Sequence, residues 1–357
     1  MRKSNEGMSM NYKIVCLAGD GIGPEVTQSA TQVLEAIAKK FDHNFKLQHC
    51  LFGGAAVDVE GAPLSKQTLD TCKDSDAVFL GAIGGPKWDS INPEIRPEQG
   101  LLKLRKELGV FANLRPLTMF RKLTGASPLK PELLKGVDFI IVRELIGGIY
   151  FGKKNRGMDY ASDECRYTVN EIERVCKVAC EIAIQRGKNI TSVDKANVLE
   201  TSRLWRETVS RYVNDNYPEI QLQHQLVDSC AMKIIQQPSS FDVILTENLF
   251  GDILSDEASV LSGSMGLLAS SSIGESHGLF EPIHGSAPDI AGQGIANPYA
   301  AILSAAMMLR WLKLSTEADV IEKAVEKAIN DNVLTRDLNS MSQYSTSDVT
   351  LAVIEYI

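Results

Sequence analysis

Short apolar runs alternate with longer amphipathic segments along most of this chain. The runs at residues 12–18, 76–81, 137–143 and 190–193 are each followed, beyond a turn or loop, by a segment with helical spacing. Uninterrupted apolar runs are typical of strands that are buried on both faces, as in parallel sheets covered by helices. The alternation therefore predicts an α/β fold.

A glycine-rich loop follows the first apolar run. Its glycines, Gly19, Gly21 and Gly23, have the spacing G-x-G-x-G and not the G-x-G-x-x-G of a classical dinucleotide site. No acidic residue ends a second strand at the distance from which a ribose would be bound. Pro24 suits the first turn of a following helix. We therefore do not expect a classical Rossmann nucleotide site.

Length, charge and cysteine usage exclude several classes of protein. A chain of 357 residues is long for one hydrophobic core and predicts two domains. The net charge of -8 offers no basic field for nucleic acid. Without a membrane-length apolar run or a signal-peptide core, we expect a cytoplasmic protein with no membrane contact. The seven cysteines lack metal-ligand spacing and favour reduced thiols.

Two aspartates lie one helical turn apart after the apolar run at residues 241–246. A turn leads into a predicted helix, on which Asp252 and Asp256 share one face. Hard oxygen donors held together in this way suit Mg²⁺ or Mn²⁺. Acidic residues near a helix start also favour the helix dipole without any metal, so the pair alone leaves both interpretations open.

Three arginines lie near the ends of predicted elements. Arg105 is on a helix, Arg115 precedes a proline and Arg143 ends a strand. Guanidinium groups bind carboxylates through two hydrogen bonds, so three that converge would suit a substrate with more than one carboxylate. Each arginine alone is more often a surface or ion-pair residue.

Three further side chains could complete such a pocket. Tyr150 follows a Gly-Gly turn, where it could donate a proton or serve as an interface aromatic. Lys195 lies just past an apolar run, a place where a lysine can be tuned towards a general base. Asp228 ends another apolar run and could be a third carboxylate for a metal.

Six motifs resemble those of the isocitrate/isopropylmalate family of β-decarboxylating dehydrogenases. They are residues 19–25, 113–116, 142–152, 193–197, 248–256 and 285–292. The resemblance runs from about residue 12 to the C-terminus. Within the family, the chain looks like the members that oxidise 3-isopropylmalate with NAD in leucine biosynthesis. Isocitrate, homoisocitrate and tartrate are the alternative malate-type substrates.

The resemblance implies the family's two-domain α/β fold with a non-Rossmann nucleotide site. The first domain would comprise residues 1–109 and 263–357, including the cofactor loop. The second, residues 110–262, would carry the dimer contact, a protruding arm near 153–167, and the metal and base residues. Two chains of a homodimer would then share each active site.

The resemblance also implies how the substrate and the metal are held. Arg105, Arg115 and Arg143 would bind the malate carboxylates. Mg²⁺ or Mn²⁺ would be held by three carboxylates, with Asp228 supplied by the partner subunit: Asp228, Asp252 and Asp256. Residues facing the variable group of the substrate would be Glu98, Leu101 and Leu102, with Val198 from the partner subunit. Leucines there suit an isopropyl group.

A catalytic role follows for two residues from the same resemblance. Lys195 of the partner subunit would remove the proton of the substrate hydroxyl, with Asp228 as a relay, while hydride passes to NAD. After CO₂ is lost, Tyr150 would protonate the enol. One departure lies nearby, because Ile146 stands where the family commonly has threonine.

The cofactor would lie on a loop near the C-terminal third. Residues 270–297 are rich in Gly, Ser and Pro and are predicted to form a long functional loop. The family's adenosine-binding positions within it match His284, Gly285, Ser286, Ala287, Asp289 and Asn297. Asp289 would accept hydrogen bonds from the ribose and repel a 2'-phosphate, which favours NAD over NADP. A metal-dependent lyase or phosphatase that uses the same aspartates without nicotinamide is the alternative from another class.

Overall fold

The computed structural model describes residues 10–357, and the chain divides into two compact units. Unit 1 comprises Met1–Leu108, Ser264–Ser271 and Glu275–Ile357; unit 2 comprises Gly109–Gly263 and Ser272–Gly274. The expectation about a signal peptide concerns residues 1–9 and so lies outside the described part. Between residues 10 and 357 no helix is long and apolar enough to cross a membrane. The functional roles expected of the two domains stay predictions.

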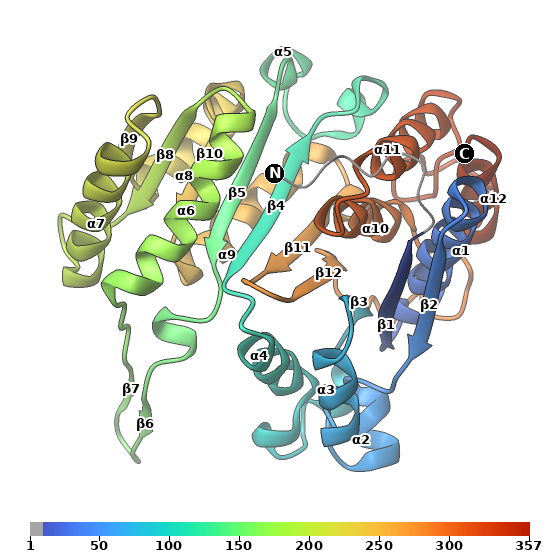
Figure 1. Ribbon diagram of the computed structural model, residues 1–357, viewed down its shortest axis with the longest axis horizontal. Helices are drawn as coiled ribbons and strands as arrows, with labels where there is room; N and C mark the ends of the chain where they lie inside the picture. Colours follow the sequence, from blue (N-terminus) through green and yellow to red (C-terminus); the bar gives the residue numbers. More distant parts are fainter. Residues whose placement is uncertain (1–9) are drawn as a thin grey trace. The chain divides into compact units, whose positions relative to one another are not determined.

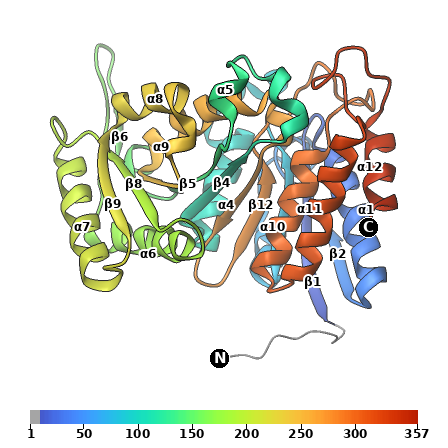
Figure 2. The same ribbon diagram turned by 90° about the horizontal axis from the view of Figure 1, so that it is seen from above.

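Unit 1 contains five strands that lie side by side, the last of them up to Ser271. Its strand order is β2 (Asn44–His49), β1 (Asn11–Gly19), β3 (Ala77–Ala82), β12 (Gly278–Pro282) and β11 (Ala269–Ile273). β1 pairs parallel with β2 and β3, and β12 pairs parallel with β3. Four of its helices pack together, as Figure 2 shows: α1 (Gly23–Phe41), α10 (Tyr299–Trp311), α11 (Ser315–Asn330) and α12 (Thr346–Glu355). The remaining ones are α2 (Gly54–Glu60), α3 (Lys66–Lys73) and α4 (Pro97–Leu108).

Helix α1 and strand β3 show why these segments fold as they do. Pro24 lies in the first turn of α1, where its missing N–H has no helical partner to lose. Val26, Ala30, Val33 and Ile37 recur at helical spacing and are fully buried. All six residues of β3 are buried, as expected for an apolar run inside a helix-covered sheet. The predicted α/β class is confirmed.

Asp20 joins three segments of unit 1. Its carboxylate is 4% exposed and accepts hydrogen bonds from the backbone N–H groups of Gly54 (2.8 Å), Ala55 (2.7 Å) and Gly84 (2.8 Å). Burial raises the pKa of Asp20, and these three hydrogen bonds act against the rise. The glycine-rich loop after β1 is thus held in place by its own aspartate.

Unit 2 contains five further strands that lie side by side. The order is β4 (Ala112–Thr118), β5 (Asp138–Glu144), β10 (Val243–Thr246), β8 (Asn189–Asp194) and β9 (Gln221–Leu226). Only β4 and β5 pair antiparallel. Figure 2 shows these strands between two helix pairs: α6 (Val169–Gln185) with α7 (Glu200–Asn216), and α8 (Val227–Gln236) with α9 (Asn248–Ser259). Four parallel strands therefore end at one edge, where ligand sites of α/β proteins form.

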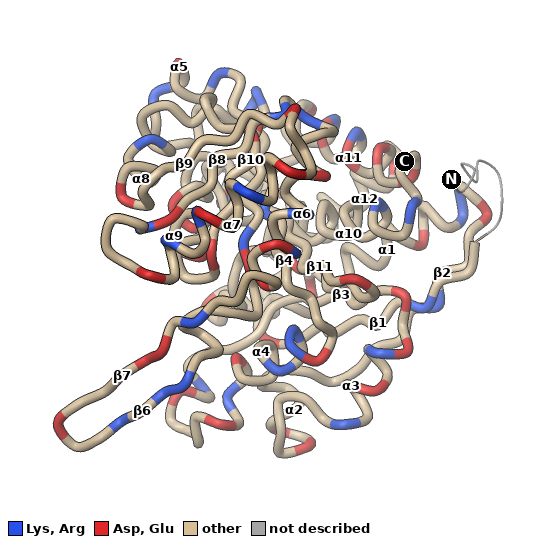
Figure 3. Tube along the Cα trace, turned by 60° about the vertical axis from the view of Figure 1, so that its left-hand side comes forward, with Lys and Arg blue, Asp and Glu red and all other residues tan. Residues whose placement is uncertain are grey.

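A two-stranded hairpin extends from unit 2 (Figure 1). It pairs β6 (Lys154–Arg156) antiparallel with β7 (Ala161–Asp163), and all six of these residues are exposed. Basic residues gather on the first strand and acidic ones near the second (Figure 3). The segment expected to be a loop or a protruding arm thus has a regular antiparallel core.

Two sequence expectations were wrong. The long loop predicted over residues 270–297 contains β11 and β12, because Ser270, Ser271 and Ser272 are small enough to be buried in a sheet although they carry no apolar signal. Asp228 does not end an apolar strand. It lies in the first turn of α8, after strand β9, in which polar and apolar residues alternate.

Candidate functional site

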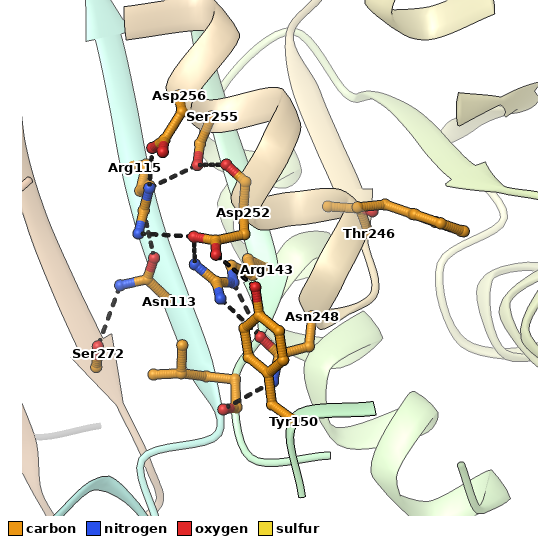
Figure 4. Close-up of polar contacts among 12 residues, drawn as sticks. Asn113, Arg115, Arg143, Tyr150, Thr246, Asn248, Asp252, Ser255, Asp256 and Ser272 are labelled. Atoms are coloured by element: carbon orange, nitrogen blue, oxygen red, sulfur yellow. Dashed lines mark hydrogen bonds and ion pairs between the residues drawn. The ribbon is translucent and has the colours of Figure 1, made fainter. Parts of the chain in front are cut away.

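A cluster of charged side chains lies at the strand ends of unit 2 (Figure 4). Arg143 on β5 is 3% exposed and donates to Asn248 Oδ1 from Nε (3.1 Å) and Nη2 (2.8 Å). Its Nη1 donates to Asp252 Oδ1. Tyr150 donates from its hydroxyl to the other oxygen of the same carboxylate, Asp252 Oδ2, at 2.7 Å. One carboxylate therefore joins the arginine and the tyrosine.

Arg115 on β4 approaches the same helix from the next strand. Its Nη1 donates to Ser255 Oγ (2.6 Å) and Asp256 Oδ1 (3.2 Å), and its Nε donates to Asn113 Oδ1 (2.8 Å). Its Nη2 lies 3.8 Å from Asp252 Oδ1. The structure thus brings Arg115, Arg143, Tyr150, Asp252 and Asp256 together, as the sequence predicts for an acid-binding pocket.

Backbone geometry explains this convergence. Arg143, near the end of β5, pairs with Asn113 near the start of the antiparallel β4 and with Thr246 at the end of the parallel β10. Helix α9 follows β10 directly and passes over Arg143. Gly251 makes this close approach possible, since a Cβ there would lie 2.6 Å from Arg143 Cγ.

The surroundings of Asp252 and Tyr150 shift the pKa of each side chain. Burial acts to raise the pKa of Asp252, but Arg143, the Tyr150 hydrogen bond and Arg115 outweigh it and lower that pKa. Burial, then the hydrogen bond to Asp252 and its negative charge, raise the pKa of Tyr150 to about 12. Near neutral pH, Tyr150 is therefore a protonated donor beside an ionised carboxylate.

Lys195 and Asp228 form a separate pair at the far strands of the same sheet. Lys195 Nζ donates to Asp228 Oδ1 at 2.6 Å, and this hydrogen bond lowers the pKa of Asp228. Asp194, 1% exposed, accepts from Arg206 Nε and Nη2 (both 2.9 Å) and from the N–H of Ala196 (2.9 Å). The hydrogen bonds of Asp194 therefore hold the bend that carries Lys195.

Two carboxylates of the site could bind a divalent metal. The described residues contain no group of three or more His, Cys, Asp or Glu side chains that could hold one. Within one chain, Asp228 does not complete a set with Asp252 and Asp256, and its arrival from a partner subunit stays a prediction. The side chains of Asp252 and Asp256 are 34% and 62% exposed, so two hard oxygen donors remain accessible on one helix face and fit Mg²⁺ or Mn²⁺.

The remaining substrate candidates lie on α4 of unit 1. Arg105 Nη2 donates to Glu281 Oε1 at 2.8 Å, while its buried Nε has no hydrogen-bond partner among the described residues. Leu101 and Leu102 precede Arg105 by four and three residues and so lie on the same side of the helix; both are half-buried, and Glu98 is exposed. In unit 2, Val198 is 61% exposed.

The predicted cofactor loop is supported by the glycine-rich loop. Ile22 N–H donates to Ser286 O at 2.8 Å, and a Cβ on Gly21 would lie 2.0 Å from that oxygen. Ala287 has a φ of 38°, a value that L-residues seldom adopt. Gly285 and Asp289 are exposed. The backbone of this loop is thus fixed while its polar groups stay accessible.

His284 and Asn297 differ in whether their polar atoms already have partners within the protein. His284 Nδ1 lies 3.0 Å from Gly285 O, and its buried Nε2 has no partner in the described chain. Burial lowers the pKa of His284, so the ring is neutral and one nitrogen can bind a ligand. Asn297 instead accepts from Tyr299 N–H (3.0 Å) and donates to Asp337 (2.9 Å). The orphaned nitrogen and the open loop fit a nucleotide cofactor.

Sequence reasoning missed several residues that hold the site. They are Asn113, Glu144, Glu247, Asn248, Ser255 and Glu281. All are polar residues at the end of an apolar run or inside a motif, and all are buried. A buried polar side chain needs a hydrogen-bond partner, so polar residues bordering apolar runs were the available signal.

The fold and the site define a class: an α/β protein whose parallel strands end in an arginine-carboxylate site and whose glycine-rich loop after β1 does not have the Rossmann spacing. The model of the isocitrate/isopropylmalate dehydrogenase family matches residues 13–353. The chain belongs to this family, as predicted, and is an oxidoreductase that acts on a small molecule. A dehydrogenase of this kind is consistent with a nucleotide and a divalent metal.

Relatives and solved structures cover nearly the whole chain. The 3-isopropylmalate dehydrogenase of Bacillus subtilis is 52% identical over 347 residues, 95% of this chain and 94% of the relative. That of Geobacillus kaustophilus is 55% identical over 335 residues, 92% and 90% of the two chains. The isocitrate dehydrogenase of Methylococcus capsulatus superposes with a TM-score of 0.85 at 35% identity, covering 97% of this chain and 99% of that one. A β-decarboxylating dehydrogenase of Thermococcus kodakarensis gives 0.81 at 37%, covering 97% and 96%.

Proposed function

We propose that this protein catalyses the NAD-dependent oxidative decarboxylation of (2R,3S)-3-isopropylmalate to 4-methyl-2-oxopentanoate and CO₂, a step of leucine biosynthesis in the cytoplasm. The carrying observation is that curated 3-isopropylmalate dehydrogenases are 52% and 55% identical to this chain along at least nine-tenths of it. The arginine-carboxylate cluster supports a dicarboxylate substrate.

Arg105, Arg115 and Arg143 bind the two carboxylates of the substrate. The guanidinium groups of Arg115 and Arg143 already donate to the carboxylates of Asp256 and Asp252. A carboxylate of the substrate forms hydrogen bonds of the same kind with these guanidinium groups. Leu101 and Leu102 contact the isopropyl group, with Glu98 on the same helix and Val198 of the partner subunit. Burial of that group is worth about 2 kcal/mol, so discrimination against smaller alkylmalates is partial.

Lys195 and Asp228 move the hydroxyl proton. Lys195 Nζ gives a proton to Asp228, its 2.6 Å neighbour, and the amine that results takes the proton of the C2 hydroxyl. NAD, when bound, accepts the hydride from C2. Mg²⁺ or Mn²⁺, held by Asp252, Asp256 and Asp228 of the partner subunit, would lower the pKa of that hydroxyl and stabilise the negative charge that develops. Tyr150 then gives its phenolic proton to the carbon that has lost CO₂.

The cofactor loop binds the adenosine half of NAD. His284 Nε2 and the exposed backbone of Gly285 offer hydrogen bonds, with Ser286, Ala287 and Asn297 shaping the loop. Exposed Asp289 accepts from the ribose hydroxyls and repels a 2'-phosphate, so NAD is preferred to NADP.

A homodimer completes the active site. Unit 2 exposes large apolar side chains that a second copy would cover: Met158, Val198, Met232, Ile253 and Val260. Asp252 and Asp256 lie on helix α9, which also exposes Ile253 and is followed directly by the exposed Val260. Lys195 and Asp228 of the partner subunit would reach the carboxylates that one chain alone leaves incomplete.

The test is NAD reduction with 3-isopropylmalate and Mg²⁺, run beside isocitrate, homoisocitrate and tartrate and repeated with NADP. We expect reduction with 3-isopropylmalate and NAD, and its loss in Lys195→Ala. Faster turnover of another diacid would overturn the substrate while keeping the chemistry. Turnover of a diacid or phosphate ester without any nicotinamide would favour the lyase or phosphatase alternative, which no feature of the structure supports.

A further inference from the structure

Asn248 is the first residue of α9 and is fully buried. Its Oδ1 accepts two hydrogen bonds from Arg143, from Nε (3.1 Å) and Nη2 (2.8 Å). Its Nδ2 donates to Leu145 O and Gly147 O, both at 3.1 Å. An amide side chain has two donors and accepts two bonds through its oxygen, so all its capacity is used within the protein.

The first half of this arrangement orients Arg143. Two nitrogens on one edge of a planar guanidinium share a single oxygen, which fixes the plane of the group. The remaining nitrogen, Nη1, then faces Asp252. Figure 4 shows the amide of Asn248 beneath the guanidinium and Asp252 beside it.

The second half orients Tyr150. Leu145 O and Gly147 O belong to the turn that leads into the short helix Gly148–Tyr150. Gly148 has a φ of 71°, which glycine adopts without strain, so this turn depends on its hydrogen bonds for its shape. From it the Tyr150 hydroxyl reaches Asp252 Oδ2 at 2.7 Å.

We propose that Asn248 is a positioning residue that sets the carboxylate-binding Arg143 and the proton donor Tyr150 in one geometry. The inference rests on the proposed function, in which these two groups bind and protonate the substrate. Asn248 makes its side-chain hydrogen bonds within the protein and acts through one oxygen on Arg143 and one amide nitrogen on the turn. Removing either half therefore has a different kinetic effect.

The variant Asn248→Asp separates the contact to Arg143 from the contacts to the turn before Tyr150. The aspartate keeps an oxygen for Arg143 but loses both N–H donors to the turn. We expect KM for 3-isopropylmalate to stay within about threefold and kcat to fall roughly tenfold or more, because Tyr150 is misplaced. Asn248→Ala loses both halves, so KM rises as well. If the alanine variant does not fold, the nearly isosteric aspartate variant still carries the test.

A double-mutant cycle with Tyr150→Phe distinguishes positioning from general damage. Once the hydroxyl is gone, Asn248→Asp should lower kcat by less than about twofold further, since its effect acts through that hydroxyl. Val209→Ala, in the buried core of unit 2, is the control: it should lower the melting temperature and leave KM and kcat unchanged.

Two results would overturn the inference. One is an equal loss of kcat from Asn248→Asp with and without the Tyr150 hydroxyl; the other is wild-type kinetics in Asn248→Asp. Failure of the wild-type protein to oxidise 3-isopropylmalate would overturn the proposed function instead. In that case the same ratios, measured on whichever diacid is oxidised, still decide the role of Asn248.

Discussion

Lys195 Nζ lies 2.6 Å from Asp228 Oδ1, and the two residues follow the carboxyl ends of neighbouring parallel strands. β8 pairs with β9 so that Asp194 is opposite Leu226, which places the bend before Lys195 beside the start of α8. An ammonium and a carboxylate held this way can pass a proton between them. The pair is complete within one chain before any substrate arrives.

Replacing Lys195 tests its role as the base. Lys195→Ala should lower kcat by about 10²- to 10⁴-fold, the usual contribution of a positioned acid or base, and leave NAD affinity unchanged. Steady-state rates and NAD binding by calorimetry measure the two effects. Lys177→Ala, which removes an exposed i,i+4 ion pair with Glu181, is the matched control and should behave as wild type. A tenfold or smaller loss in Lys195→Ala would assign proton removal elsewhere.

Mixing two inactive variants tests whether subunits share sites. Tyr150→Phe and Lys195→Ala should each be nearly inactive alone. In a heterodimer, one site would carry both lesions and the other neither. After unfolding and refolding together, an equal mixture should recover about a quarter of the wild-type rate, because half the dimers are mixed and each has one intact site. A rate equal to the mean of the two parents would place all catalytic groups of a site in one chain.

Glu144 predicts a pH dependence of stability. Burial raises its pKa from 4.5 to about 7, although the N–H groups of Ile146 and Gly147 and the nearby Arg174 act to lower it. A carboxyl whose pKa is higher in the folded state favours folding when protonated. Its contribution is fully present below about pH 4.5 and is lost as the pH rises through 7. The loss amounts to about 3 kcal/mol by pH 8.

The matching variant is Glu144→Gln, which cannot ionise. Urea unfolding of both proteins from pH 4.5 to 8 gives the free energy of unfolding of each. The wild-type value minus the variant value should fall by about 3 kcal/mol across this range, whatever its absolute size. Glu173→Gln, at the surface of α6, should run parallel to wild type. A constant difference for Glu144→Gln would mean that Glu144 ionises at its ordinary pKa.

Asp289 predicts the choice of cofactor. Asp289→Ser removes the negative charge from the exposed loop, so a 2'-phosphate no longer meets a like charge. The ratio of kcat/KM for NADP to that for NAD should rise about 10- to 100-fold, mostly through a lower KM for NADP. The control is Glu275→Gln, a change of the same charge that lies before the predicted adenosine-binding positions His284 to Asn297. An unchanged ratio would separate Asp289 from the ribose site.

The fold was predictable where signals are local. The runs that form β1, β3, β5, β8 and β10 are mostly apolar, because the central residues of each strand are buried on both faces of the sheet. β9 and β11 were not predicted, since β9 is mostly polar and β11 consists largely of serines that are buried only in the folded protein.

The charged residues that converge in the site were easier to predict than the buried polar residues that hold them in place. Asp252 and Asp256 share a helix face, which their spacing alone predicts. The oxygens that accept from Asn248 lie 103 and 101 residues away in sequence, so no local pattern indicates that contact. The involvement of Lys195, Asp228 and Val198 of a partner subunit rests on the family resemblance and stays a prediction.

Asp20 couples the opening of the segments of unit 1 that it binds. One buried carboxylate holds the amides of Gly54 and Ala55, at the start of helix α2, and of Gly84, in the loop after β3. For any of these amides to exchange its hydrogen with water, the carboxylate must release it, and a released carboxylate has to be solvated. The three amides should therefore exchange at one shared rate, so that the glycine-rich turn and its two neighbouring segments open as a single cooperative unit.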